Sequence, residues 1–320
     1  YLLSLYNDTG NEEYKNYANQ LAKDGMYKPN FWNENISYMF NYQIGWMYLR
    51  YFMWNFSGRQ NDTQGYGLNG GGKMYLEGNW LTGVNMIDEQ RLGSQANLPA
   101  FIAENAGYNR YFMLPLILGL IGFIFHTVRA PKDMVSVLLL FLLTGLAIVV
   151  YLNQKPMEPR ERDYAYAASF YAFAVWIGIG VYALFDAARN FKWKNIGMIA
   201  AYSFGTGIFL YIIELIAGGE FPSHAWSFSI LYISFVGLLM YTLVGFVGHS
   251  VKNNQVTGSL ATVLGLVIPM ILCMQNWDDH DRSNRSTARD FAYNYLLSCD
   301  EKSEGGKGAI IFTNGDNDTF

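Results

Sequence analysis

Six apolar segments between residues 112 and 275 constrain this chain more than any other feature. A hydrocarbon core of about 30 Å requires about 20 mostly apolar residues in a helix. Only helices and closed barrels satisfy backbone polar groups in lipid, and these segments lack the alternating pattern of barrel strands. The sequence therefore predicts six membrane helices: Phe112–Val128, Met134–Leu152, Ala165–Phe185, Ile196–Ala217, Trp226–Gly248 and Thr257–Gln275.

The charges in the connecting loops predict how these helices are oriented. One set of loops carries Arg129 and Lys132, then three basic residues between positions 186 and 195, then Lys252. The alternate loops, Asn153–Tyr164 and Gly218–Ala225, have balanced charges or no Lys and Arg. Because short cytoplasmic loops are enriched in Lys and Arg, we expect the first set in the cytoplasm. Residues 1–111 and 276–320 would then lie outside it.

The bulk composition agrees with a chain that is part membrane and part aqueous. Hydrophobic residues make up 51% of the sequence and charged residues 15%, yet the mean hydropathy is only +0.07. The net charge of −4 gives no indication of nucleic-acid binding. The chain starts without an initiator Met and stops soon after a predicted buried strand, so we interpret it as an internal fragment of a longer protein.

The predicted extracytoplasmic region, residues 1–111, contains an aromatic segment at 35–56. This segment is long enough to span, but it holds Asn41, Gln43 and Arg50, so we expect a helix lying along the membrane surface. Its rings would belong to an aromatic belt, or would form a platform beside a lipid-linked or sugar substrate.

A polar cluster follows the aromatic segment directly. It comprises Arg59, Gln60, Asn61 and Asp62 and opens a Gly-rich loop, which lacks the Gly-Lys-Ser/Thr ending of a phosphate-binding P-loop. Loops on rigid scaffolds often carry function, and simple turn chemistry accounts for these residue types equally well.

The loop before the third predicted helix concentrates alternating charges: Arg160, Glu161, Arg162 and Asp163. An arginine guanidinium matches the geometry of a phosphate group, so a lipid-borne phosphate is the natural partner on the outer face. The alternative is an internal network of Arg and Asp or Glu that braces two helices.

Further ionisable residues are candidates for function. Glu214 lies about one turn below the predicted outer end of its helix and is a candidate by its depth, unless it reaches the surface. After the last helix come residues that could bind a divalent cation, or could favour a helix N-terminus: Asp278, Asp279, His280 and Asp281. A predicted amphipathic helix and a buried strand follow, so an α/β-like domain is expected to begin near 276, with Asp316 and Asp318 at the end of its strand.

Four stretches of the chain together resemble a known family. They are NYQIGWMYLRYFMWNFSGRQND, GLAIVVYLNQKPMEPRERDYAYAASFYAFAVWIGIGV, NWDDHDRSNRSTARDFAYNYL and AIIFTNGDNDTF. The sequence is similar to large bacterial multipass glycosyltransferases of the GT-C class, which are related to animal transmembrane protein O-mannosyltransferases. The resemblance implies an enzyme of the bacterial inner membrane with periplasmic outer segments. It also implies a polyprenyl-linked sugar donor and an acceptor protein modified at Ser or Thr.

The resemblance places the catalytic acid of the family upstream of this chain, so the expected contribution here is donor binding. Arg160, Arg162 and Arg59 would bind the donor phosphate, while acidic and polar neighbours support them. Two other functions fit the same features: a transporter or flippase of lipid-linked glycans, and a non-catalytic scaffold subunit of an envelope complex.

Overall fold

The computed structural model of the chain describes residues 12–23, 31–63, 76–95, 98–155, 162–190, 192–217, 225–251, 253–281, 283 and 286–300. The chain divides into two compact units, Tyr1–Asn276 and Trp277–Phe320, which are described separately. The first unit contains the predicted extracytoplasmic region and the membrane helices.

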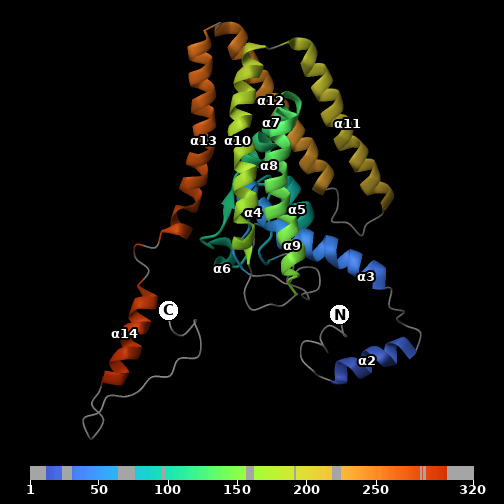
Figure 1. The fold of residues 1–320 in the computed structure, drawn as a ribbon, viewed down its shortest axis with the longest axis vertical. Coiled ribbons are helices and arrows are strands. Elements are labelled where there is room, and N and C mark those ends of the chain that lie inside the picture. The colour runs from blue at the N-terminus through green and yellow to red at the C-terminus, as the bar shows by residue number, and fades with distance from the viewer. Residues whose placement is uncertain are drawn as a thin grey trace. The chain divides into compact units, whose positions relative to one another are not determined.

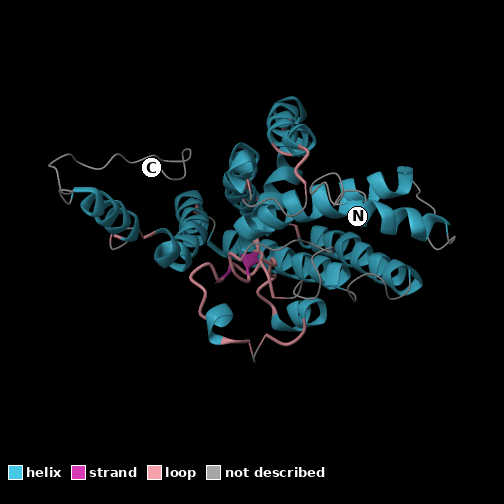
Figure 2. Ribbon diagram, turned by 90° about the horizontal axis from the view of Figure 1, so that it is seen from below, coloured by secondary structure: helices cyan, strands magenta, loops and turns pink. Residues whose placement is uncertain are grey.

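Short helices and one small sheet make up the part of the first unit before the membrane helices (Figures 1 and 2). Strand β1 (Gly58–Arg59) pairs with strand β2 (Asn109–Arg110) in antiparallel register, with Gly58 opposite Arg110. The helices are α2 (Glu12–Lys23), α3 (Phe31–Ser37), the π-helix η1 (Tyr38–Leu49), α4 (Arg50–Phe56), α5 (Asn85–Leu92) and α6 (Ala100–Ala103).

The remaining helices contain the membrane spans. They are α7 (Leu114–Arg129), α8 (Pro131–Thr144), α9 (Leu146–Leu152), the short 3₁₀-helix η3 (Asp163–Tyr166), α10 (Ala167–Arg189), α11 (Trp193–Ala217), α12 (Ala225–Val251) and α13 (Asn254–His280). Within the described residues, five stretches are long and apolar enough to cross a membrane: Pro131–Leu152, Asp163–Arg189, Ile196–Ile216, Ser227–Val251 and Asn254–His280. The fold is therefore that of a helical polytopic membrane protein.

The first predicted span is shorter than the other five. Helix α7 has 16 residues, so it extends roughly 24 Å along its axis. Phe112 and Met113 have positive φ angles of 51° and 55°, which are incompatible with helical winding, and the helix starts after them. It also differs from the spans in its surroundings, because much of it, including Ile117, Leu118 and Gly122, is buried by protein.

Helices α7 and α10 approach each other closely through glycine. A Cβ atom built on Gly122 would overlap the carbonyl oxygen of Trp176, and one built on Gly180 would overlap the carbonyl oxygen of Leu118. Small residues at such contacts let two backbones pack directly in a membrane, where burial of apolar surface gives little drive for association. The glycines therefore set the central helix pair of the bundle.

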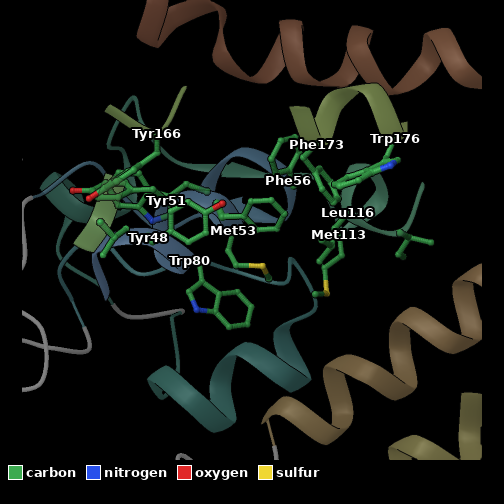
Figure 3. Close-up of a cluster of buried hydrophobic side chains, with 14 residues drawn as sticks. Tyr48, Tyr51, Met53, Phe56, Trp80, Met113, Leu116, Tyr166, Phe173 and Trp176 are labelled. Atoms are coloured by element: carbon green, nitrogen blue, oxygen red, sulfur yellow. The ribbon is translucent and has the colours of Figure 1, made fainter. Parts of the chain in front are cut away.

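Aromatic rings from the segment before β1 pack into the protein core (Figure 3). The rings of Phe52 and Phe56 lie 4.8 and 4.6 Å from the ring of Phe173, measured between centroids. Figure 3 shows Tyr48 and Tyr166 at one side of this cluster and Phe173 and Trp176 at the other. Within the segment 35–56, for which we predicted a position along the bilayer surface, residues 50–54 and Phe56 are buried by protein. The rings of Phe52 and Phe56, four residues apart, both contact α10 through Phe173.

The ends of the helices alternate as the sequence predicts. At one end, Arg129 of α7 forms an ion pair with Asp186 of α10, with 3.0 Å between Nη2 and Oδ2. At the other end, Gln275 of α13 bonds to Arg110, which lies just before α7. We call this second end the polar end: residues 57–111, 153–155, 162–163 and 275–276. Successive loops therefore lie at opposite ends of the bundle, whichever face is cytoplasmic.

The second unit contains helix α14 (Thr287–Asp300). The hydroxyl of Ser286 donates to the carboxylate of Asp290 over 2.5 Å, and this carboxylate lies in the first turn, where the helix dipole favours a negative charge. The rings of Phe291 and Tyr295 stack at 5.8 Å on one face. A helix is present where the sequence predicts an amphipathic one from Ser286 onward, while the predicted strand after it lies outside the described residues.

Candidate functional site at the polar end

The loop with the alternating charges starts and ends within the described residues. It begins at Asn153, which closes α9 with a left-handed φ of 42°, and it ends at Arg162, which directly precedes η3. We call this segment the arginine loop. Arg162 and Asp163 are both exposed, whereas Arg160 and Glu161 lie outside the described residues.

The start of the arginine loop is bound by the π-helix η1. The Tyr38 hydroxyl donates to the carbonyl of Gln154 over 2.6 Å, and the Tyr42 hydroxyl donates to the carbonyl of Lys155 over 3.3 Å. The side-chain amide of Gln43 donates to the Oδ1 atom of Asn153 over 2.6 Å. These bonds connect residues more than 100 positions apart in sequence, so η1 contributes to the placement of residues 153–155.

The residues after the arginine loop are bound by the same π-helix. The hydroxyls of Tyr48 and Ser169 lie 2.6 Å apart, and the Tyr48 ring meets the ring of Tyr166 edge to face at 5.5 Å. The Ser169 hydroxyl also lies 2.8 Å from the carbonyl oxygen of Phe141, to which it can donate. Tyr48, Tyr166 and Ser169 are almost fully buried, so this contact is a fixed part of the core.

The predicted cluster at 59–62 lies on β1 and the turn that follows it. Arg59 donates from Nε to the carbonyl of Gly107 over 2.6 Å, and its guanidinium lies 5.3 Å from the ring centroid of Trp54. The carboxylate of Asp62 accepts a bond of 2.8 Å from the side chain of Asn105. Arg59 is half-buried, so it retains some access to solvent.

Gln60 and Asn61 are buried and organise the surrounding backbone. The Oδ1 atom of Asn61 accepts from the backbone N–H groups of Thr63 and Gly78, at 3.1 and 2.8 Å. The side chain of Gln60 donates to Gln95 over 2.7 Å. The sequence left two alternatives for these residues, a functional loop or simple turn chemistry. The contacts are those of turn chemistry, and both side chains stabilise the local backbone.

Arg50 is a buried cation that the sequence signalled only as a charge within an aromatic run. Its guanidinium lies 4.2 to 4.8 Å from the ring centroids of Trp46, Tyr51 and Trp54. It also donates to the carbonyl of Gly78 over 3.2 Å, as does the indole of Trp54 over 3.1 Å. Cation–π contacts of this kind stabilise a desolvated arginine, so Arg50 ties α4 to the loop around Gly78.

Asp88 organises the turn before α5 and was not singled out in the sequence. Its carboxylate accepts bonds of 2.8 and 3.0 Å from the backbone N–H groups of Thr82 and Gly83, and one of 3.0 Å from the Thr82 hydroxyl. Burial raises the pKa of Asp88 above its usual value, while the bonds from Thr82 and the charge of Arg91 oppose this change. Burial also lowers the pKa of Arg91 to about 10, so this guanidinium stays charged at neutral pH.

The end of α13 closes the free edge of β2. The side-chain amide of Gln275 accepts from the N–H of Arg110 over 2.7 Å and donates to the carbonyl of the same residue over 2.8 Å. Asn276 donates to the hydroxyl of Tyr111 over 2.5 Å and accepts from Asn109 over 3.1 Å. The amide of Gln275 therefore takes the place of a third strand.

Glu214 has a structural partner at the polar end of its helix. Its carboxylate accepts a bond of 2.6 Å from the Ser227 hydroxyl and one of 3.2 Å from the backbone N–H of Ser227. Ser227 lies in the first turn of α12, where a carboxylate is favoured by the unpaired N–H groups and the helix dipole. The pair connects α11 to α12.

The predicted cation site lies in the second unit. Asp278 and His280 are exposed, and Asp279 lies 3.8 Å from the Nδ1 atom of His280. These residues are consecutive on the last turn of α13, where side chains point in directions about 100° apart and do not converge. Across the described part of the chain, no group of three or more His, Cys, Asp or Glu could hold a metal ion. Asp316 and Asp318 lie outside the described residues.

Comparisons with protein families, curated proteins and solved structures found no match for this chain. The five spanning helices among the described residues make this chain a helical membrane protein. The described residues at its polar end form a defined structure.

Proposed function

We propose that this protein is a membrane glycosyltransferase of the GT-C type. It moves a sugar or glycan from a polyprenyl-phosphate donor to an acceptor outside the cytoplasm, with Ser or Thr of a protein as the expected acceptor. Support comes from the resemblance of four stretches of the sequence and from the membrane-spanning helices. The location that follows is the bacterial inner membrane, with the polar end on the periplasmic face.

The observation that supports the proposal most is at the polar end, where the aromatic π-helix η1 binds the start of the arginine loop. Tyr38, Tyr42 and Gln43 bind the start of the arginine loop, and Arg162 is exposed at its end. A donor of this class has a lipid tail that stays between helices and a phosphate that stays at the water boundary. Because Arg162 directly precedes the span Asp163–Arg189, we assign it to the water boundary, where that phosphate would lie.

The chemistry divides between this chain and residues expected upstream. The bond between the sugar C1 and the phosphate oxygen breaks, and the acceptor hydroxyl oxygen bonds to C1. Its proton passes to a carboxylate base, and polyprenyl phosphate leaves with the additional negative charge. Arg162, together with Arg160, would neutralise that charge in the transition state, while Arg59 would add a further cation.

The test is a transfer assay on the full-length protein in detergent or nanodiscs. It uses polyprenyl-phosphate sugar and an acceptor peptide, with mass spectrometry of the peptide as the readout. We expect Arg160→Ala and Arg162→Ala each to lower the transfer rate about 100-fold, the range for loss of one group that stabilises transition-state charge. Unchanged transfer rate and donor affinity in both folded variants would show that these arginines do not bind the phosphate.

The same preparation separates the alternative of a lipid-glycan transporter. A transporter would move the labelled donor across vesicles without forming glycosylated peptide. It would also require ionisable groups along a path through the membrane, and the candidate for that role, Glu214, is hydrogen-bonded to Ser227 at the start of a neighbouring helix. We therefore favour the transferase.

A further inference from the structure

We infer that an exposed apolar row on α3 and the first residues of η1 lies in the surface of the bilayer, next to the polar end. The row consists of Trp32, Ile36 and Phe40, which are 74%, 49% and 57% exposed. Its partner is the boundary between the lipid headgroups and the acyl chains. This inference concerns an interaction surface and does not depend on the proposed function.

The row belongs to a helical element that is only half in the protein core. Helices α3, η1 and α4 follow one another without a break from Phe31 to Phe56. The last turns of this element are buried, whereas all residues from 32 to 37 are exposed. A surface position, which the sequence predicts for 35–56 as a whole, is therefore assigned to the beginning of this segment and is extended to α3.

The exposed half of the element has rows of different chemical character, because residues four apart share a face of a helix. Next to the apolar row lies a polar row, in which the side chain of Asn41 donates to the hydroxyl oxygen of Ser37 over 3.0 Å. Another row contains Tyr38 and Tyr42, whose rings stack at 5.3 Å between centroids. The element is therefore amphipathic where it leaves the core.

The tyrosine row attaches this half of the element to the end of a membrane span. The hydroxyls of Tyr38 and Tyr42 donate to the backbone carbonyls of residues 154 and 155. The span Pro131–Leu152 ends immediately before these residues. Tyrosine side chains are favoured at the boundary between membrane and water, which agrees with this attachment. The exposed half of the element is thus held at the level where the span leaves the lipid.

The apolar row continues the surface that the same span presents to lipid. Val150 and Tyr151, in the last turn of the span, are 63% and 83% exposed. Side chains two positions apart on a helix point in nearly opposite directions, so Ile36 points away from the attachment that Tyr38 makes. An exposed apolar row at this level meets the bilayer surface, where burial removes its apolar area from water.

The charges of the segment indicate which force would hold it in the membrane. Positions 31–49 include Glu34 and contain no Lys or Arg. Attraction to anionic lipids depends on basic residues near the membrane surface, so it does not contribute here. Burial of apolar and aromatic area is the remaining force, and it should not depend on the charge of the lipid headgroups.

The experiment measures the depth of spin labels on the full-length protein in nanodiscs, in a background whose other cysteines are replaced by Ser. Ile36→Cys and Phe40→Cys carry labels on the apolar row, and the matched controls Asn33→Cys and Ser37→Cys carry them on the polar row. All four positions are exposed, so a label needs no space in the core. Tyr151→Cys gives the reference for lipid. Depth follows from the ratio of collisions with oxygen, which is enriched in lipid, to collisions with a water-soluble nickel chelate.

We expect the labels at 36 and 40 to lie about 5–10 Å into the boundary between headgroups and acyl chains, and those at 33 and 37 to lie in water. The depths should be the same in phosphatidylcholine and in its mixture with phosphatidylglycerol. Equal access of the nickel chelate to all four positions would overturn the inference, as would a depth that appears only with phosphatidylglycerol.

A different result would identify another occupant of the row. Low access of both oxygen and the chelate at 36 and 40 would show that protein covers these side chains, either a second copy of the chain or another partner. That result would also overturn the inference. None of these outcomes requires transfer activity, so the test remains informative if the proposed function is wrong.

Discussion

At the scale of single residues, side chains replace backbone hydrogen bonds throughout the polar end. The amide of Gln275 bonds to both backbone groups of Arg110, and the carboxylate of Asp88 accepts from two successive backbone N–H groups. Strand β2 is only two residues long, so it depends on such bonds more than a long strand would. Removing one partner leaves a buried polar group without a hydrogen bond, and the desolvation of that group then lowers the stability of the fold.

The first prediction concerns Gln275. We expect Gln275→Ala to lower the free energy of unfolding by about 1–2 kcal/mol, because the N–H and carbonyl of Arg110 lose their partner in a partly buried site. Unfolding in detergent, followed by intrinsic fluorescence, measures the change. Met274→Ala is the control, since Met274 is the preceding residue and is 75% exposed. Equal loss in both variants would contradict the role of the amide.

The second prediction concerns Asp88. Asp88→Ala removes the acceptor for three hydrogen bonds in a buried turn, so we expect a loss of about 2–4 kcal/mol in stability. The same unfolding measurement applies. Glu89→Ala changes the neighbouring exposed carboxylate and should stay within about 0.5 kcal/mol of the wild type. A small effect at Asp88 would mean that the turn reorganises without it.

Sequence reasoning succeeded at this scale where chemistry is local, and failed where partners are distant. The turn residues Gln60 and Asn61 were recognisable from their type and position. Nothing in the sequence around Gln275 indicates that its partner is Arg110, because 165 positions separate them. The same holds for Gln43 and Asn153, which are 110 positions apart.

At the scale of elements, the length of the apolar segments predicted the membrane spans well. The departures occur where helices pack against other parts of the protein. Five of the six predicted helices have spanning length. A continuous apolar run in lipid must satisfy its backbone polar groups internally, and this favours a helix. Helix α7 is shorter than predicted because Phe112 and Met113 have positive φ angles, and both α7 and the aromatic segment pack against α10. Composition cannot distinguish a ring that faces lipid from a ring that faces another helix.

The third prediction tests the contact between α7 and α10. Gly122→Ala adds a methyl group that would overlap the carbonyl oxygen of Trp176, so the helices must separate. We expect a loss of about 1–3 kcal/mol, the usual cost of overpacking, measured by thermal unfolding in detergent. Gly178→Ala on α10 is the control, because a Cβ there meets no atom within 4 Å. A stable Gly122→Ala protein would show that the pair is not closely packed.

At the scale of the whole molecule, the alternation of helix ends leaves one binary choice, namely which end faces the cytoplasm. The end with Arg129 and Asp186 belongs to the loops that are richer in Lys and Arg. The polar end belongs to the loops with balanced or no basic charge. The positive-inside rule therefore predicts that the polar end lies outside the cytoplasm.

The fourth prediction tests this orientation in intact spheroplasts. The background carries Cys273→Ser and Cys299→Ser, and single cysteines replace Lys155 or Lys132. A maleimide that cannot cross membranes should label the position at 155 in intact cells and the position at 132 only after lysis. The reverse pattern would place the arginine loop in the cytoplasm and would exclude a periplasmic donor phosphate as its ligand.

The bond between Arg110 and Gln275 also bears on how the chain is made. A ribosome adds roughly 5–20 residues per second, so the 165 positions between these residues take roughly 8–33 s to synthesise. During that interval α13 is incomplete, and the outer edge of β2 has no amide partner. Completion of α13 supplies that amide, so the pairing of this strand edge is one of the later steps in folding of the chain.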